Sequence, residues 1–428
     1  MTNRFLSAAL AAAALAAAPA AAQTIAITGG TVHPVSGPAI PNGTVIITNG
    51  RITAVGAGIA VPAGARRIDA TGKIVTPGLI ESSTNMALIE VESVGTTNDF
   101  RFQDNEDQVA AAFNVADGIN PRSMVIPVTR IAGVTTVVSR PAGGLIAGQG
   151  LAFDLVGDNI AEMQIRSPIA MFGSVSENAH QAGGGTRGGV FMRLREVLED
   201  ARAWNRNPQG YERGETREFS VSRLDLAALQ PVLRGEMPLV VEAHRASDIQ
   251  TVLRLAQEYD LKVIITGGTE GWMVADDLAR ARVPVLVKVL RNLPESFESL
   301  GARYDNAALL RRAGVQVAIT TGETYRAFNI RQEAGNAVAY GLPYEEALRA
   351  ITLYPAQIYG MADRYGTLEV GKVANVVVWS GDPLELLTNV EHVFIRGQEV
   401  PLVSRETLLR DRYMNLDENV RTYPAPRP

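Results

Sequence analysis

The sequence predicts an α/β fold, a (β/α)8 TIM-like barrel with a small β-sandwich domain built from the N- and C-terminal segments. Between residues 79 and 365, short apolar strands alternate with helical segments, which is typical of parallel strands covered by helices. Strand-rich segments lie before and after this region. A doubly wound open sheet is the alternative, but no Gly-x-Gly-x-x-Gly motif follows a predicted strand to favour it.

The first 22 residues have the pattern of a secretory signal peptide. Arg4 supplies a positive charge, residues 5–18 are apolar, and the small residues 20–22 precede Gln23. A membrane anchor is the alternative, but the apolar stretch is shorter than the roughly 20 residues that a membrane span needs. We therefore expect export, a periplasmic mature protein and no membrane insertion after cleavage. Secretion beyond the periplasm stays open.

The composition is that of an ordinary globular protein, with 46% hydrophobic and 20% charged residues. A net charge of −5 and a pI near 5.6 argue against nucleic acid or an anionic membrane surface as a partner. The chain has no cysteine, which excludes disulfides and lipid attachment through a thiol.

The β-rich ends are expected to form one small domain. Short β runs at residues 24–27, 43–48 and 51–55 are separated by turn residues, and Asn49-Gly50 is a strong hairpin signal. Further β runs occupy residues 371–379 and 390–397. The predicted boundaries are a signal peptide at 1–22, sandwich segments at 23–78 and 366–402, a barrel at 79–365 and a C-terminal helix and tail at 403–428, with the helix at 405–415.

Inside the barrel region, buried strands are predicted at residues 132–138, 239–242, 262–265, 283–289 and 315–320, each followed by a helical segment. Barrel enzymes place their sites at the C-terminal ends of the strands. Polar residues at those ends are therefore the candidates for function.

Residues 75–86 join the two predicted domains. They contain Val-x-Pro-Gly-Leu-Ile followed by the carboxylate of Glu81. This segment resembles the start of the first barrel strand in the metal-dependent amidohydrolase superfamily. The resemblance covers nearly the whole mature chain and is nearest to the exported imidazolonepropionase-like and prolidase-like branch. It implies descent from hydrolases of C–N bonds in cyclic amides or dipeptides.

The resemblance also locates the family's metal ligands, and most of those positions have changed. The aligned positions hold Ser83, Asn85, Phe172, Gly267 and Gly322, and only His244 is retained. Asn375, in the second β segment, stands where the family has aspartate. A catalytic metal needs three or more protein ligands. We therefore expect no metal and no other cofactor, with zinc or another divalent metal only if an altered site is active.

The polar residues that remain define a metal-free site. His244 with Glu177 and Glu242 forms the predicted catalytic group, because a carboxylate beside a histidine can act as a general acid–base couple. The predicted ligand-binding residues are Asn85, Arg140, His180, Arg245, Lys288 and Glu323. Burial would lower the pKa of Lys288. The alternative is a salt-bridge network that fills the space left by the metal.

The main functional hypothesis is an exported amidohydrolase-superfamily protein with a degenerate metal centre, weak or no hydrolase activity and a small-molecule ligand in the barrel mouth. The alternative is an active hydrolase with an altered mono-metal or metal-free site at His244 and the nearby carboxylates. A purely structural module, without a pocket, is a third hypothesis. A homo-oligomer and a pairing with an active homologue both stay open.

Overall fold

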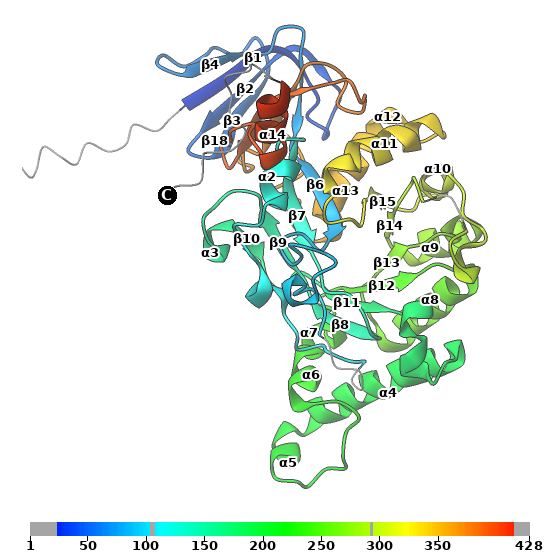
Figure 1. The fold of residues 1–428 in the computed structure, drawn as a ribbon. Coiled ribbons are helices and arrows are strands. Elements are labelled where there is room, and N and C mark those ends of the chain that lie inside the picture. Colours follow the sequence, from blue (N-terminus) through cyan, green and yellow to red (C-terminus); the bar gives the residue numbers. More distant parts are fainter. Residues whose placement is uncertain (1–23, 103–107, 292–293, 415–428) are drawn as a thin grey trace, which may run out of the picture.

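The computed structural model describes residues 24–102, 108–291 and 294–414. The predicted signal peptide and the end of the predicted tail lie outside the described residues. Figure 1 shows a small sheet domain at one end of the molecule and a larger barrel, with helices along its outer side, at the other.

The small domain is a single hydrogen-bonded sheet to which both ends of the chain contribute. Its order is β18-β17-β16-β5-β1-β2-β3, with β4 beside β1. Antiparallel pairing of β5 with β16, from Pro77↔Val376 to Ile74↔Trp379, joins the two segments. The strands are β1 (Thr24–Val32), β2 (Ile40–Thr48), β3 (Arg51–Ala57), β4 (Arg66–Asp69), β5 (Ile74–Pro77), β16 (Val376–Trp379), β17 (Val390–Ile395) and β18 (Gln398–Glu399).

The predicted sandwich is thus one curled sheet. β1 is long enough to pair with β4 along its first half, from Ile25↔Arg66, and with β5 near its end, at Val32↔Val75. Buried apolar residues of every strand except β18 face a common core, so the sheet closes around its own interior. The hairpin predicted at Asn49-Gly50 joins β2 to β3, and both residues have positive φ, as a type I′ turn requires.

The barrel is confirmed. The barrel wall has eight strand positions, here called staves, and β8 and β9 share the third. Each stave contributes one buried apolar residue to the interior, as expected for a filled barrel. These residues are Ile80, Val138, Ala152, Phe172, Val240, Ile264, Leu286 and Ala318. The strands are β6 (Leu79–Thr84), β7 (Val134–Ser139), β8 (Ile146–Gln149), β9 (Leu151–Asp154), β11 (Met171–Ser174), β12 (Leu239–Ala243), β13 (Val263–Gly267), β14 (Val285–Val287) and β15 (Val317–Ile319).

The third stave departs from the predicted all-parallel arrangement. β8 and β9 follow one another along it; β9 pairs antiparallel with β7, and β8 pairs antiparallel with β11. The chain turns back within residues 140–145, between β7 and β8, which is too short a connection for the helical crossover that a parallel strand needs. β10 (Gln164–Arg166) extends β9 as a further antiparallel strand. The glycine-rich turn that reverses the chain therefore lies at the barrel mouth.

Helices cover the outside of the barrel (Figure 1). The longest, α4 and α8, each bury an apolar stripe. The α-helices are α2 (Val125–Arg130), α3 (Ile160–Met163), α4 (Arg187–Arg206), α5 (Pro208–Glu212), α6 (Arg223–Ala228), α7 (Gln230–Leu233), α8 (Ala246–Tyr259), α9 (Ala275–Ala281), α10 (Asn306–Arg312), α11 (Ile330–Ala339), α12 (Tyr344–Ala350), α13 (Leu353–Ile358) and α14 (Arg405–Met414). Short 3-10 turns are η1 (Gly95–Thr97), η2 (Val115–Gly118), η3 (Glu177–Gly183), η4 (Gly271–Val274), η5 (Phe297–Ser299) and η6 (Ala327–Asn329).

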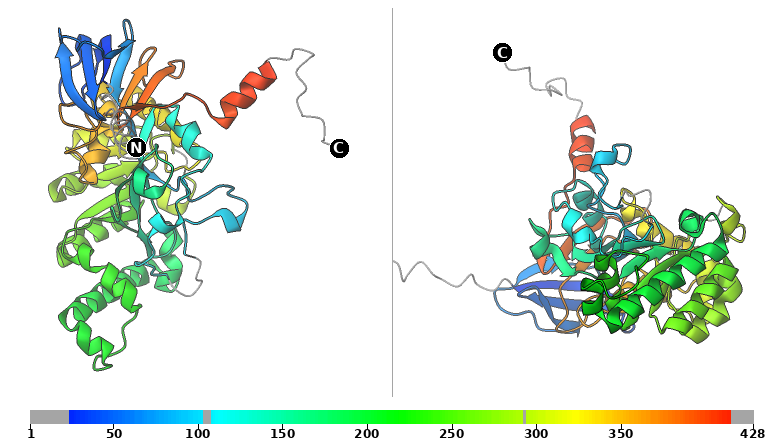
Figure 2. Two further views of the ribbon diagram at one scale, coloured as in Figure 1. Left: turned by 90° about the vertical axis from the view of Figure 1, so that its left-hand side faces the viewer. Right: turned by 90° about the horizontal axis from the view of Figure 1, so that it is seen from below.

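The C-terminal helix predicted from residue 405 is α14. It projects from the body, and none of its residues is buried (Figure 2). In the described part of the chain, no helix combines the length and the apolar character needed to cross a bilayer.

A buried carboxylate joins the barrel to the small sheet. Asp154, at the end of β9, is fully buried. Its Oδ1 accepts hydrogen bonds from Asn375 Nδ2 at 2.8 Å and Thr136 Oγ1 at 2.8 Å. Its Oδ2 accepts from Arg396 Nε at 2.6 Å and Tyr365 Oη at 3.0 Å. The amide of Asn375 donates to Asp154, which an ionised aspartate at this position could not do.

Candidate functional site

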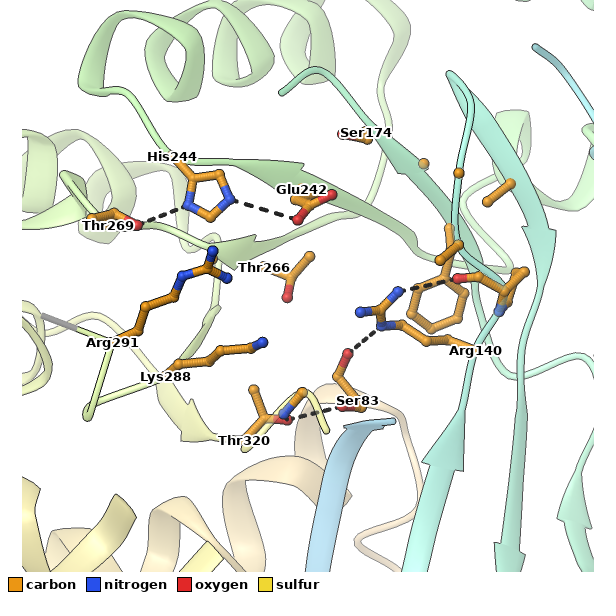
Figure 3. A pocket seen from close by; sticks show the side chains of 18 of the residues that line it. Ser83, Arg140, Ser174, Glu242, His244, Thr266, Thr269, Lys288, Arg291 and Thr320 are labelled. Atoms are coloured by element: carbon orange, nitrogen blue, oxygen red, sulfur yellow. Dashed lines mark hydrogen bonds and ion pairs between the residues drawn. The ribbon is translucent and has the colours of Figure 1, made fainter. Parts of the chain in front are cut away.

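A pocket opens at the C-terminal ends of the barrel strands and has a volume of about 830 Å3, counted to its open mouth. Figure 3 shows side chains from around the barrel pointing into it. Four basic side chains, Arg140, Lys288, Arg291 and Arg303, line the pocket, and Glu242 is the only carboxylate among the lining residues. With histidine neutral, the lining carries an excess of positive charge.

Arg140 occupies the first side of the pocket, directly after β7. Its Nε donates to Ser83 Oγ at 2.7 Å, and its Nη1 donates to the Pro141 carbonyl at 3.2 Å. The Arg140 backbone is fixed as well, because its N–H donates to Thr84 O at 2.8 Å and its carbonyl accepts from Asn85 Nδ2 at 2.7 Å. Ser83 and Asn85 thus hold a guanidinium at the end of the first strand.

Lys288 follows β14 and fills the space beside Gly322. A Cβ atom at Gly322 would lie 2.1 Å from Lys288 Cε and 2.5 Å from Nζ. Burial lowers the pKa of Lys288; Glu323 opposes this shift, whereas Arg291 and Arg140 add to it. Because Gly322 has no side chain, the Lys288 amine can occupy this part of the pocket.

Glu242 lies in β12, and His244 is the residue that directly follows this strand. A Cβ atom at Gly267 would lie 2.6 Å from His244 Cε1, so the imidazole fills the space beside that glycine. His244 Nδ1 lies 2.8 Å from Thr269 Oγ1, and Nε2 lies 3.6 Å from Glu242 Oε1. Burial alone would raise the pKa of Glu242, but His244 and the charge of Arg140 outweigh burial and lower the pKa to about 2. Glu242 is therefore ionised at neutral pH.

Glu81 lies beneath the pocket and is fully buried. Its Oε1 accepts from the Ser83 N–H at 3.1 Å and from the Thr320 hydroxyl, and its Oε2 accepts from the Thr321 N–H at 3.0 Å and Oγ1 at 2.8 Å. Burial raises the pKa of Glu81 to about 7, against the effect of these hydrogen bonds. Glu81 thus positions Ser83 and Thr320, two residues of the pocket wall.

The structure brings four of the predicted site residues together in the pocket, namely Arg140, Glu242, His244 and Lys288. Asn85 holds the Arg140 backbone, and Glu323 Oε1 lies 3.9 Å from Lys288 Nζ, but neither residue lines the pocket. They belong to the supporting layer around it.

Three predicted site residues lie away from the pocket lining. Glu177 and His180 belong to η3, which packs against α4; the Glu177 carboxylate lies 3.6 Å from Arg187 Nη2. Arg245 directly precedes α8. The loop after β11 folds as a helical turn over the outer helices, and this turn carries Glu177 and His180 away from the strand ends.

Several lining residues are not among those predicted from the sequence, including Arg291, Arg303, Thr269 and Asn306. Arg291 and Arg303 belong to the long connection between β14 and α10. The Arg303 guanidinium lies 4.5 Å from the ring centre of Trp272 and pairs with Asp305. Arg291 lies only a few residues after the predicted strand at 283–289, whereas Arg303 has no such signal in the sequence.

The residues of the pocket do not fit the family's metal. Across residues 24–102, 108–291 and 294–414, no three His, Cys, Asp or Glu side chains gather in a way that could hold a metal ion. The lining offers one imidazole and one carboxylate beside four cations. Such a set lacks the three ligands that a catalytic site needs, and its positive charge opposes a divalent cation.

The comparisons with known proteins agree with the fold. Residues 234–400 match the model of the Amidohydrolase family. The chain is 24% identical over 389 residues to the amidohydrolase tasK of Hapsidospora irregularis, covering 83% of this chain but only 39% of that protein. It is 25% identical to an imidazolonepropionase of Polaromonas sp., covering 87% of this chain and 89% of the relative.

A solved amidohydrolase from Thermotoga maritima is similar over 89% of this chain and all of its own, with a TM-score of 0.81 and 28% identity. The composite sheet, the barrel and the pocket at its strand ends define the class of amidohydrolase-type barrels. Residues 234–400 thus carry an amidohydrolase-family domain, and amidohydrolases and imidazolonepropionases are among the chain's relatives, as its sequence motifs predict.

Proposed function

We propose that this protein binds a small organic anion at the barrel mouth through arginine and lysine side chains, without a catalytic metal and with weak or no hydrolase activity. One observation carries the proposal. Where the family has metal ligands, Ser83 binds the Arg140 guanidinium and the space beside Gly322 holds Lys288.

The charge of the pocket favours an anion. Bringing several cations together in a partly buried space is unfavourable unless a negative charge offsets them. Among the lining residues only Glu242 is a carboxylate, while Asp305 pairs with Arg303 and Glu295 pairs with Arg291 from outside the lining. Guanidinium groups bind carboxylates through two parallel hydrogen bonds, so Arg140, whose hydrogen bonds go to the neutral Ser83 hydroxyl and Pro141 carbonyl, suits a carboxylate ligand.

A metal-free hydrolase is the second candidate, and the contacts of His244 favour it. Its Nδ1 is held by Thr269 at 2.8 Å, while its Nε2 faces Glu242 at 3.6 Å. An imidazole oriented in this way can act as a general base. If this candidate holds, amide hydrolysis is readily measured in the wild type and disappears in His244→Ala; under the main proposal the wild type shows little or no hydrolysis to begin with.

Two measurements on the purified protein test the main proposal. Elemental mass spectrometry after zinc or manganese loading is expected to find less than about a tenth of an equivalent, against a family whose sites bind zinc tightly. Calorimetric titration with small carboxylates, such as N-acetylated amino acids, is expected to show binding that weakens as salt rises. Stoichiometric metal, or no carboxylate binding at any salt concentration, would contradict the proposal.

Export is a separate part of the proposal, supported by the signal pattern of residues 1–22. Sequencing of the mature N-terminus is expected to begin at Gln23, in a periplasmic fraction. A homo-oligomer would appear in light scattering, and a pairing with an active homologue would appear as co-purification with a metal-loaded amidohydrolase.

A further inference from the structure

We propose that Lys288 forms an imine with the carbonyl group of a small 2-oxo acid that binds in the pocket. This inference rests on the proposed anion binding and names the class of ligand. It gives the lysine a covalent role in addition to its charge.

The first support is the position of the amine. The Lys288 side chain points into the pocket and is 26% exposed, so it is sheltered but within reach of a ligand (Figure 3). Among the described residues, the one ion-pair partner recorded for its Nζ is Glu323 Oε1, at 3.9 Å. This distance is too long for a hydrogen bond. The amine is therefore not held in a tight salt bridge.

The second support is the charge around the amine. Only a neutral amine has a lone pair that can attack a carbonyl carbon, and a lysine becomes neutral more readily when it is desolvated or lies beside other cations. Burial, Arg291 and Arg140 all lower the pKa of Lys288, while the charges of Glu323 and Glu242 oppose them. The same cations that favour an anion thus also favour the reactive form of the lysine.

These requirements together define the ligand. It needs a carboxylate for the guanidinium groups and an electrophilic carbonyl close to it, a combination that 2-oxo acids provide. The Nζ lone pair forms the N–C bond as the C=O electron pair moves to oxygen. Nitrogen then loses two protons, oxygen gains two, and water leaves to give the neutral imine. No oxidant or reductant is needed.

The sequence makes this inference easy to test, because it contains only four lysines, Lys73, Lys262, Lys288 and Lys372. Lys73 is paired with Glu391, and Lys372 Nζ lies 2.9 Å from Glu369. Lys262 is exposed. Lys262 is therefore a matched control for an accessible lysine outside the pocket.

The experiment is reductive trapping on the full chain. The protein is incubated with pyruvate and sodium cyanoborohydride near neutral pH, and the adduct is located by intact mass and peptide mapping. We expect one adduct per chain, on Lys288, lost in Lys288→Arg and kept in Lys262→Arg. Equal labelling of several lysines, or labelling of Lys262 in preference to Lys288, would overturn the inference.

A second variant keeps the lysine but moves it. In Gly322→Ala the new Cβ would displace Lys288 Cε and Nζ, and the positive φ of 63° adds backbone strain. Trapping is expected to slow on the order of a hundredfold, because a shift of about 1 Å is enough for such a loss. Gly314→Ala, with φ +93° and open space around it, controls for the strain. Unchanged trapping in a folded Gly322→Ala variant would contradict the inference.

The two proposals fail in different ways. Calorimetric binding of lactate, which has the carboxylate but no carbonyl, tests the anion site alone. Lactate binding without an adduct from pyruvate would overturn the imine and leave the anion site standing. Neither binding nor adduct would overturn both.

Discussion

The Nε of Arg140 donates a hydrogen bond to Ser83 Oγ at 2.7 Å, and through it the end of β7 is joined to the end of β6. The same guanidinium helps to lower the pKa of Glu242 on the opposite wall, so one side chain acts on both sides of the pocket. The charge of Arg140 therefore influences both the binding of an anion and the ionisation of Glu242.

Replacing Arg140 with Gln should weaken carboxylate binding by about ten- to a hundredfold, since a hydrogen bond to a charged group contributes about 1.5–3 kcal/mol. Arg140→Lys should recover part of the affinity, because it restores the charge but not the two-pronged contact. Calorimetry on the three proteins measures the effect. Equal affinity in Arg140→Gln and the wild type would show that the ligand binds elsewhere.

The same substitution should raise the pKa of Glu242 from about 2 towards its ordinary value, because a cationic partner is removed while burial remains. The chemical shift of the Glu242 carboxyl carbon, followed during an acid titration, reports this change. A midpoint that does not move would mean that His244 alone sets the charge state of Glu242.

Glu81 should make the stability of the protein fall as pH rises. Its pKa is about 7 in the folded protein, against 4.5 for an ordinary glutamate in the unfolded chain, so between these values the folded state holds a proton that the unfolded state has lost. The free energy of unfolding therefore decreases across this window, by about 3 kcal/mol in total. Urea unfolding at pH 4.5 and pH 8 measures it.

The matched comparison is Glu81→Gln, which cannot titrate. The stability difference between the wild type and this variant should favour the wild type more at pH 4.5 than at pH 8. A difference that is equal at both values would mean that Glu81 remains ionised throughout, held so by its four hydrogen-bond donors.

Asp154→Ala should destabilise the protein strongly, by about 3–5 kcal/mol, because it leaves the Arg396 guanidinium without its carboxylate at the joint between barrel and sheet. Chemical unfolding measures the loss. Asp158→Ala, at an exposed position four residues away, is the control and should change stability by less than about 0.5 kcal/mol. Similar losses in both variants would show that the Asp154 network contributes little.

Gly322→Asp restores the family's carboxylate at one position, and we expect no metal binding from it, because Ser83 and Gly267 still lack ligand side chains. The new carboxylate would pair with Lys288 and weaken anion binding. Gly314→Asp adds the same charge at an open surface position and is the control. Tight, stoichiometric zinc in Gly322→Asp would contradict the interpretation of the pocket.

The sequence predicts the architecture well because the architecture depends on local patterns. Apolar runs such as residues 239–242 and 262–265 are short, bounded by turn residues and separated by helical segments, and this order indicates where the strand ends lie. His244, Glu242, Lys288 and Arg140 were found by this reasoning, since each lies within one or two residues of a strand end.

The residues that were misplaced or missed lie farther from the strands, where side-chain position depends on how a loop folds. Glu177 follows β11 closely, yet η3 carries it towards Arg187. Arg303 lies 16 residues after the end of β14 and still returns to the pocket, where it stacks on Trp272. The hydrophobic periodicity of the sequence does not predict the course of such a loop. The reversed third stave was missed because its turn reads as an ordinary glycine-rich loop.

The pairing of β5 with β16 has a consequence for how the protein is made. Ile74 emerges from the ribosome about 300 residues before its partner Trp379. During that interval one edge of β5 has no hydrogen-bonding strand, and an unpaired edge invites association with other chains. The small sheet can therefore be completed only after Trp379 has been synthesised, so chains truncated before that residue should be prone to aggregate.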